Sequence, residues 1–213
     1  MHSYAPFLVE RTFEQIKLDF DHQGTSAILA SVGGTWDSAA SGRTHQAPED
    51  VSLLASLRTW TVRVPGHPDE LEAILRRDHA NGERAYLRMT NDANRRFQSP
   101  HPDRIATVRQ GSWDAPTVLG VGPVLDQILE ATADLDVTVL YTATPFPIDA
   151  EGLRMATTGS TSFTTTHRVI NRIHRNTTNA GTTSLPAGAA SLAQLGVAML
   201  GIADFTDGCP ALG

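Results

Sequence analysis

The stretch Trp60-Thr61-Val62-Arg63-Val64-Pro65, with Ala85-Tyr86-Leu87-Arg88-Met89 after it, decides the fold class of this chain. Both runs are short and largely apolar, which predicts buried strands, and the first ends at a proline. Residues 70–79 between them carry a helical pattern. Upstream, residues 27–32 predict another strand and residues 48–57 a helix. The order strand, helix, strand, helix, strand is typical of an α/β protein with a parallel sheet.

A second module follows a polar segment. Residues 91–104 are polar and contain two prolines, which predicts a linker between modules. We place the first domain at 1–98, the linker at 99–103 and the second domain at 104–213. Strands and helices are again predicted in alternation, at 117–122, 124–133, 137–141 and 150–155. Further on we predict a strand at 162–166, a weak helix at 169–175, and either a strand or the start of a buried helix at 192–202.

Composition excludes several classes of protein. The chain has 213 residues, which suits one large domain or two small ones, and a formal net charge of -6, which argues against nonspecific nucleic-acid binding. Cys209 is the only cysteine, so no internal disulfide can form. No apolar run reaches the roughly 18 residues of a membrane span, and the N-terminus lacks a signal-peptide pattern. We therefore expect a cytoplasmic protein that does not bind membranes.

The segment Ser41-Gly42-Arg43-Thr44-His45-Gln46-Ala47-Pro48-Glu49-Asp50 holds the leading candidate for a catalytic group. A glycine, then Thr-His-Gln, then an acidic helix start places the imidazole of His45 on a tight turn, which Gly42 permits. Enzymes often hold a proton-transfer or substrate-binding group at such a turn. An ordinary loop histidine is the alternative.

Several strings, in order along the chain, resemble the transketolase family, especially transketolases encoded as two polypeptides. Within a predicted helix at 6–20, Phe7-Leu8, Arg11 and Phe13-Glu14-Gln15-Ile16 resemble "FL..RAFDQI", and Thr44-His45-Gln46 with Glu49-Asp50 resembles "G.THQ..ED". Weaker similarities cover 64–70, 85–88, 118–130 and 145–149. The resemblance implies the later part of a parallel-sheet pyrimidine-binding domain, followed by a transketolase C-terminal-like α/β domain.

The resemblance also implies a cofactor, thiamine diphosphate, which serves as the electron sink while the protein binds and orients it. Carried over by position, Phe7 stacks against the aminopyrimidine with Tyr4 near it, and Phe13 is a second wall. Arg11 is a candidate phosphate contact of the cofactor, with a structural or interface charge as the alternative.

His45 would face the substrate in this family, as a hydrogen-bond donor or proton shuttle, with Gln46 and Gly42 forming the substrate-binding turn. The sequence has no Gly-Asp-Gly with a downstream Asn, the family's magnesium-diphosphate motif, and the family's activating glutamate lies upstream of the aromatic pair. We therefore expect an N-terminal transketolase-like partner subunit that supplies the Mg²⁺ site and that glutamate, in a hetero-oligomer with two chains of each kind.

The expected function is transfer of a two-carbon ketol or acyl unit between sugar-like substrates, only in the complex. Two alternatives stay open. Thr166 stands where the family has Glu before His167, and Phe146 replaces a usual lysine, which would suit a decayed scaffolding or regulatory subunit. Tyr4-x-x-Phe7 matches deoxyxylulose-phosphate synthases, which use pyruvate. A divergent tail suggests a specialised sugar or natural-product pathway.

Overall fold

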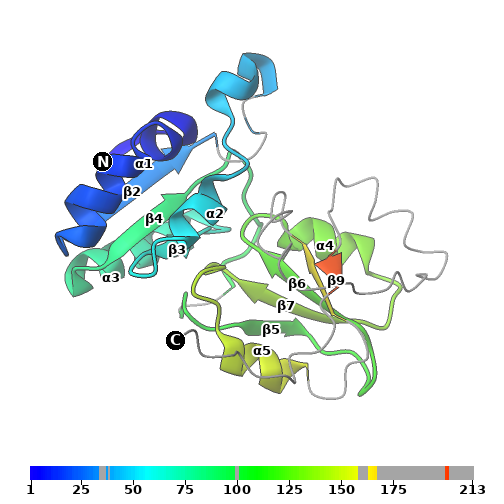
Figure 1. Ribbon diagram of the computed structural model, residues 1–213. Coiled ribbons are helices and arrows are strands. Elements are labelled where there is room, and N and C mark those ends of the chain that lie inside the picture. The colour runs from blue at the N-terminus through cyan, green and yellow to red at the C-terminus, as the bar shows by residue number, and fades with distance from the viewer. Residues whose placement is uncertain (34–36, 38, 99–100, 158–162, 167–199, 202–213) are drawn as a thin grey trace.

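Two β-sheets organise the chain, and each is the centre of one α/β unit (Figure 1). The computed structural model describes residues 1–213 except 34–36, 38, 99–100, 158–162, 167–199 and 202–213. Within the described residues, none of the helices has the length and apolarity of a membrane span.

The first sheet is parallel throughout. Its strands run in the order β1-β2-β4-β3, with bounds β1 (His2–Tyr4), β2 (Ala27–Val32), β4 (Arg84–Arg88) and β3 (Thr61–Arg63). The parallel sheet predicted from the apolar runs is therefore confirmed. Strand β1, which pairs Tyr4 with Val32, was not predicted.

Helical segments connect these strands. The predicted helix at 6–20 is present as three pieces, in which Arg11 N–H donates to the Pro6 carbonyl across a wide turn at 2.9 Å. A longer helix begins after His67, whose Nδ1 accepts from the Asp69 N–H at 3.2 Å, and ends at Gly82 in the left-handed conformation. The bounds are η1 (Pro6–Glu10), α1 (Phe13–Gln15), η2 (Ile16–His22), η3 (Ala39–His45), α2 (Asp50–Ala55) and α3 (Pro68–Asn81).

Alternate residues of the first sheet face two different layers. One face packs against the segments η1 and α2, through a core that includes Leu29, Val62, Tyr86, Leu8, Val9, Val51 and Leu54. The other face packs against α3, through Ile28, Ala30, Leu87, Leu71 and Ile74. This arrangement follows from the period of two in a strand, and it places the turn before α2 beside one face of the sheet.

The second sheet is mixed. Its order is β5-β7-β6-β8-β9, with β5 and β9 antiparallel to their neighbours and the other pairs parallel. The bounds are β5 (Ala106–Arg109), β6 (Thr117–Val121), α4 (Leu125–Ala131), β7 (Thr138–Thr142), α5 (Ala150–Ala156), β8 (Phe163–Thr166) and β9 (Leu200–Gly201). The helix predicted at 169–175 lies outside the described residues, and of 192–202 only 200–201 are described, as a strand.

The two units share one hydrophobic core. The N–H groups of Val62 and Val64 donate to the carbonyls of Phe146 and Ala143, both at 2.7 Å, so the second unit covers the edge of β3. Leu119 and Leu140 from the second sheet belong to the same apolar cluster as Val62 and Val64.

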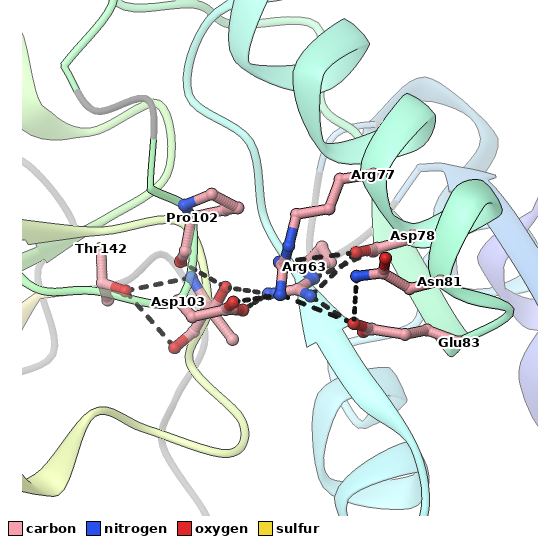
Figure 2. A network of polar contacts seen from close by, with 9 residues as sticks. Arg63, Arg77, Asp78, Asn81, Glu83, Pro102, Asp103 and Thr142 are labelled. Carbon is pink, nitrogen blue, oxygen red and sulfur yellow. Dashed lines mark hydrogen bonds and ion pairs between the residues drawn. The ribbon is translucent and has the colours of Figure 1, made fainter.

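Arg63 is the polar centre of this joint (Figure 2). Its guanidinium, 1% exposed, forms a two-pronged pair with the carboxylate of Asp78 in the first unit, at 2.9 and 3.0 Å. It also donates to Thr144 Oγ1 at 2.7 Å and pairs with Asp103, both on the side of the second unit. One buried cation thus ties β3 to the chain that leads into the second sheet.

Candidate active site

The first predicted site residue, Tyr4, lies at the carboxyl end of a strand. Tyr4 is the last residue of β1 and pairs with Val32, the last residue of β2. Segment η1 begins directly afterwards and holds Phe7. Ligands of open α/β sheets commonly bind beyond this edge, because loops there surround a crevice.

Three rings, which we call the aromatic cluster, meet at this edge: Tyr4, Phe7 and His45. The centroid of His45 lies 5.0 Å from that of Tyr4 and 5.1 Å from that of Phe7, both edge to face. Tyr4 and Phe7 are 6.2 Å apart at an interplanar angle of 75°. Such edge-to-face pairs are attractive because a ring's positive edge meets a negative face. Tyr4 is 41% exposed, so the cluster presents an aromatic surface to solvent.

Of the other two predicted cofactor contacts, one joins the cluster and one does not. The guanidinium of Arg11 lies over the ring of Phe7, 4.6 Å from its centroid, in a cation–π arrangement. Phe13 instead packs against the hydrophobic core beneath the sheet.

The turn before His45 depends on Gly42. Its backbone angles, φ 66° and ψ -163°, belong to a region that only glycine occupies readily. Beyond it, Thr44 Oγ1 donates to the Ser41 carbonyl at 3.1 Å and lies 2.9 Å from His45 Nδ1. Gln46 is 6% exposed, so its side chain points into the protein. The structure therefore places His45 at the surface of the turn and Gln46 beneath it.

Charged groups surround this turn. Arg43 donates to Glu49 at 2.8 Å across the loop. Burial raises the pKa of Glu10, in η1, and the nearby Glu49 raises it further, while Arg43 acts in the opposite direction. Two carboxylates near the turn, those of Glu10 and Glu49, thus repel one another.

The sequence did not predict a buried set of polar side chains under the turn. Asp50 Oδ2 accepts from the Tyr86 hydroxyl at 2.6 Å and from Arg88 Nε at 2.7 Å, and Ser31 Oγ lies 2.6 Å from the same hydroxyl. We call these four residues the Asp50 network. None of the four side chains is more than 1% exposed. The sequence signal was slight: an arginine within an apolar strand and an acid at a helix start.

Burial and the charge of Asp50 both raise the pKa of Tyr86. The phenol therefore keeps its proton and donates a hydrogen bond to the Asp50 carboxylate. Burial alone would lower the pKa of Arg88, but Asp50 outweighs it and the pKa is raised. Arg88 therefore stays a cation, and it lies against Asp50 inside the first unit.

Sequence comparison gives three informative relatives, while no family model matches the chain. An uncharacterized 33.6 kDa protein in the fasciation locus of Rhodococcoides fascians is 41% identical over 153 residues, which is 72% of this chain and 48% of that protein. A subunit of an apulose-4-phosphate transketolase of Actinobacillus succinogenes is 24% identical, over 70% of this chain and 50% of that protein. A 6-deoxy-6-sulfo-D-fructose transketolase subunit of Clostridium sp. is 23% identical, over 70% and 49%.

Structural comparison shows a transketolase fold. The structure of a split-gene transketolase, described as an inactive beta4 tetramer, superposes with a TM-score of 0.65 at 23% identity, over 77% of this chain and 55% of that one. A Pichia stipitis transketolase variant superposes with a TM-score of 0.60 at 13% identity, over 73% and 25%.

The chain is similar in sequence to transketolase subunits and has a transketolase fold.

The chain spans about half the length of the curated relatives it matches. The α/β fold predicted from sequence is confirmed, and so is the resemblance to transketolases. The domain boundaries and the roles of the individual site residues stay predictions. Among the described residues, no group of three or more His, Cys, Asp or Glu side chains is arranged to hold a metal ion.

Proposed function

We propose that the chain is one subunit of a heteromeric, thiamine-diphosphate-dependent transketolase-like enzyme that transfers a two-carbon ketol unit between sugar-like substrates. The aromatic cluster carries the proposal. The ring centroids of Tyr4 and Phe7 lie within 5.1 Å of the ring centroid of His45, at the carboxyl edge of a parallel sheet. His45 is about forty positions further along the chain. Residues 1–98 would be the later part of the pyrimidine-binding domain, and 104–213 the C-terminal-like domain.

The cluster fits one side of an aminopyrimidine ring. Tyr4 and Phe7 offer a partly exposed aromatic wall, and the guanidinium of Arg11 lies over the ring of Phe7. We assign Phe7 and Tyr4 to the ring of the cofactor and Arg11 to a nearby anionic group. Phe13 packs against the hydrophobic core. The bound cofactor would supply the electron sink for cleavage and formation of the carbon–carbon bond.

His45 is the residue we assign to the substrate. Its ring is half-buried against the cluster, and its Nδ1 lies 2.9 Å from the Thr44 hydroxyl, which leaves Nε2 to meet a substrate oxygen. A positioned imidazole can donate a hydrogen bond or move a proton there. Gly42 and Gln46 shape the turn around it.

A partner chain is proposed to hold the diphosphate, the Mg²⁺ and the activating glutamate. Two relatives are named as transketolase subunits, and the split-gene neighbour is described as inactive in a tetramer of beta chains. These names support a hetero-oligomer whose activity needs both kinds of chain. The same names refer to modified ketoses, which supports a ketose donor over pyruvate.

Reconstitution tests the proposal. The chain is mixed with an N-terminal transketolase-like chain from the same source, and ketol transfer from a ketose is measured with thiamine diphosphate and Mg²⁺. We expect turnover in the mixture and none from either chain alone. His45→Ala should lower kcat in the mixture at least about tenfold. His79→Ala, an exposed histidine on α3, is the matched control and should change little.

Two outcomes would overturn the proposal. Turnover by this chain alone would remove the need for a partner. An active mixture that His45→Ala leaves unchanged would favour a scaffolding subunit, because the partner would then hold all the chemistry.

A further inference from the structure

The Asp50 network is linked to the aromatic cluster through neighbouring positions in the chain. Ser31 precedes Val32, whose partner across the sheet is Tyr4. Asp50 begins α2, five residues after His45. The network therefore includes a residue of β2, the strand that pairs with β1, and the residue that ends the turn leading from His45 into α2.

The network contains a charge pair that fold stability alone does not explain. Arg88 is 1% exposed and Asp50 is 0% exposed. Removing two such charges from water costs about as much as their attraction returns, so apolar residues of similar volume are often equally stabilising. A buried ion pair does, however, fix geometry, because each charge tolerates only arrangements that keep its partner within hydrogen-bond distance.

The bonds of Asp50 fix the start of α2 to the middle of the sheet. Oδ1 accepts from the N–H of Val51 at 2.7 Å, inside the first turn of the helix. Oδ2 accepts from Tyr86 and Arg88, which belong to β4, a strand paired on both sides. The segment back to His45 is short, and Gln46 and Ala47 within it are buried. Any shift of Asp50 would therefore move the turn that carries His45.

We propose that Asp50, Tyr86 and Arg88 are positioning residues for His45, and that they act by holding the start of α2 against β4. The role rests on the proposed function, since it concerns the histidine assigned to the substrate. Functional side chains generally need such support, because a displacement of about 1 Å can lower a rate a hundredfold.

A pair of matched variants tests the proposal. Tyr86→Phe removes one hydrogen bond from a phenol to a buried carboxylate in the Asp50 network. Tyr141→Phe removes a bond of the same kind, to Glu70 at the joint between the units. The chemical shifts of the His45 ring are measured by NMR on ¹³C-histidine-labelled full chain, and His45→Asn identifies the signal. These shifts report the distance and angle to the neighbouring Tyr4 and Phe7 rings.

We expect Tyr86→Phe to move the His45 signals and Tyr141→Phe to leave them in place. Unmoved signals in Tyr86→Phe would overturn the proposal, and so would equal shifts in both variants. Should Tyr86→Phe fail to fold, Ser31→Ala removes only the outer hydroxyl of the network and should give a smaller shift of the same signals. No shift in that variant would count against the proposal.

Kinetics of the reconstituted complex separate this proposal from the proposed function. Tyr86→Phe should lower kcat by on the order of tenfold with little change in KM, while Tyr141→Phe should not. If the complex shows no ketol transfer at all, the proposed function fails, yet the NMR result still decides the positioning role. If His45→Ala abolishes turnover and Tyr86→Phe changes neither signal nor rate, the function stands and the positioning role is wrong.

Discussion

The phenol of Tyr141 in β7 donates a 2.5 Å hydrogen bond to Oε2 of Glu70 in the first turn of α3, and it joins the two units through buried side chains. The same oxygen accepts from the Gly66 N–H at 2.7 Å. The other oxygen, Oε1, is buried and has no hydrogen-bond partner within the part of the chain that the structure describes. Burial raises the pKa of Glu70, because a charge is poorly solvated there.

We expect Glu70→Gln to change the pH dependence of stability. The pKa of Glu70 is higher in the folded chain than in the unfolded chain, where it is near its ordinary value of about 4.3. The wild-type chain therefore loses stability as the pH rises from that value through the raised folded pKa, since folding must then bury a charge or retain a proton. Glutamine cannot ionise, so the variant should lack this loss. Urea unfolding between acidic and mildly alkaline pH measures it.

Glu72→Gln is the control, because Glu72 lies on the same helix in an exposed pair with Arg76. It should leave the pH slope of the free energy of unfolding close to that of the wild type. Parallel slopes for Glu70→Gln and the wild type would show that Glu70 does not titrate differently in the folded chain.

Arg63→Met should destabilise the joint between the units. The substitution leaves the carboxylate of Asp78, 0% exposed, without its two-pronged partner, and it removes the link to Thr144. Breaking a buried ion pair by removing one member typically costs about 3–5 kcal/mol. Equilibrium urea unfolding should show a loss of that order. Arg76→Met, which breaks a pair that is 78% and 64% exposed, should cost about 0–1 kcal/mol. Equal losses in the two variants would contradict the role given to Arg63.

The local pattern of apolar residues in the sequence predicted most of the strands. Strands such as β2, β6 and β7 are apolar runs bounded by turn residues, and their alternation with helices predicted the parallel arrangement. Strand β1 has three residues and an uneven burial pattern, and β5 follows a polar segment. Such short edge strands depend on pairing with distant chain, which no local window of sequence reports.

In the candidate site, too, some residues could be predicted from sequence and others could not. Tyr4, Phe7 and His45 lie together in the structure and belong to strings that resemble the transketolase family, while their roles stay predictions. The partners of Asp50 and Arg63 could not be predicted, because they lie 36 and 38 residues from Asp50 in sequence, and 15 to 81 residues from Arg63. A charge at a helix start predicts a favourable dipole contact, and only the packed fold decides which buried partner it meets.

Gly42→Ala should strain the turn that carries His45. A Cβ at this position would meet no atom within 4 Å, so the cost comes from the backbone alone. At φ 66° and ψ -163° that cost is about 1–3 kcal/mol. Urea unfolding measures it, and the NMR signals of the His45 ring should move at the same time. Gly24→Ala is the control, since Gly24 also has positive φ and open space but lies after η2. It should lose stability and leave the His45 signals unchanged; a shift in both variants would show that the turn does not act locally.

Phe7→Leu should weaken the binding of thiamine diphosphate to the reconstituted complex. The substitution keeps an apolar side chain in η1 but removes the ring that meets His45 edge to face and lies under Arg11. An aromatic pair contributes about 0.5–1.5 kcal/mol beyond its buried area, which corresponds to a Kd roughly threefold to tenfold higher. Calorimetric titration of the complex measures the change. Phe20→Leu removes a ring that contacts Trp60 in the core, so it should lower stability and leave the Kd alone. Wild-type affinity in Phe7→Leu would mean that the aromatic wall serves packing, and the cofactor would then have to be held by other residues.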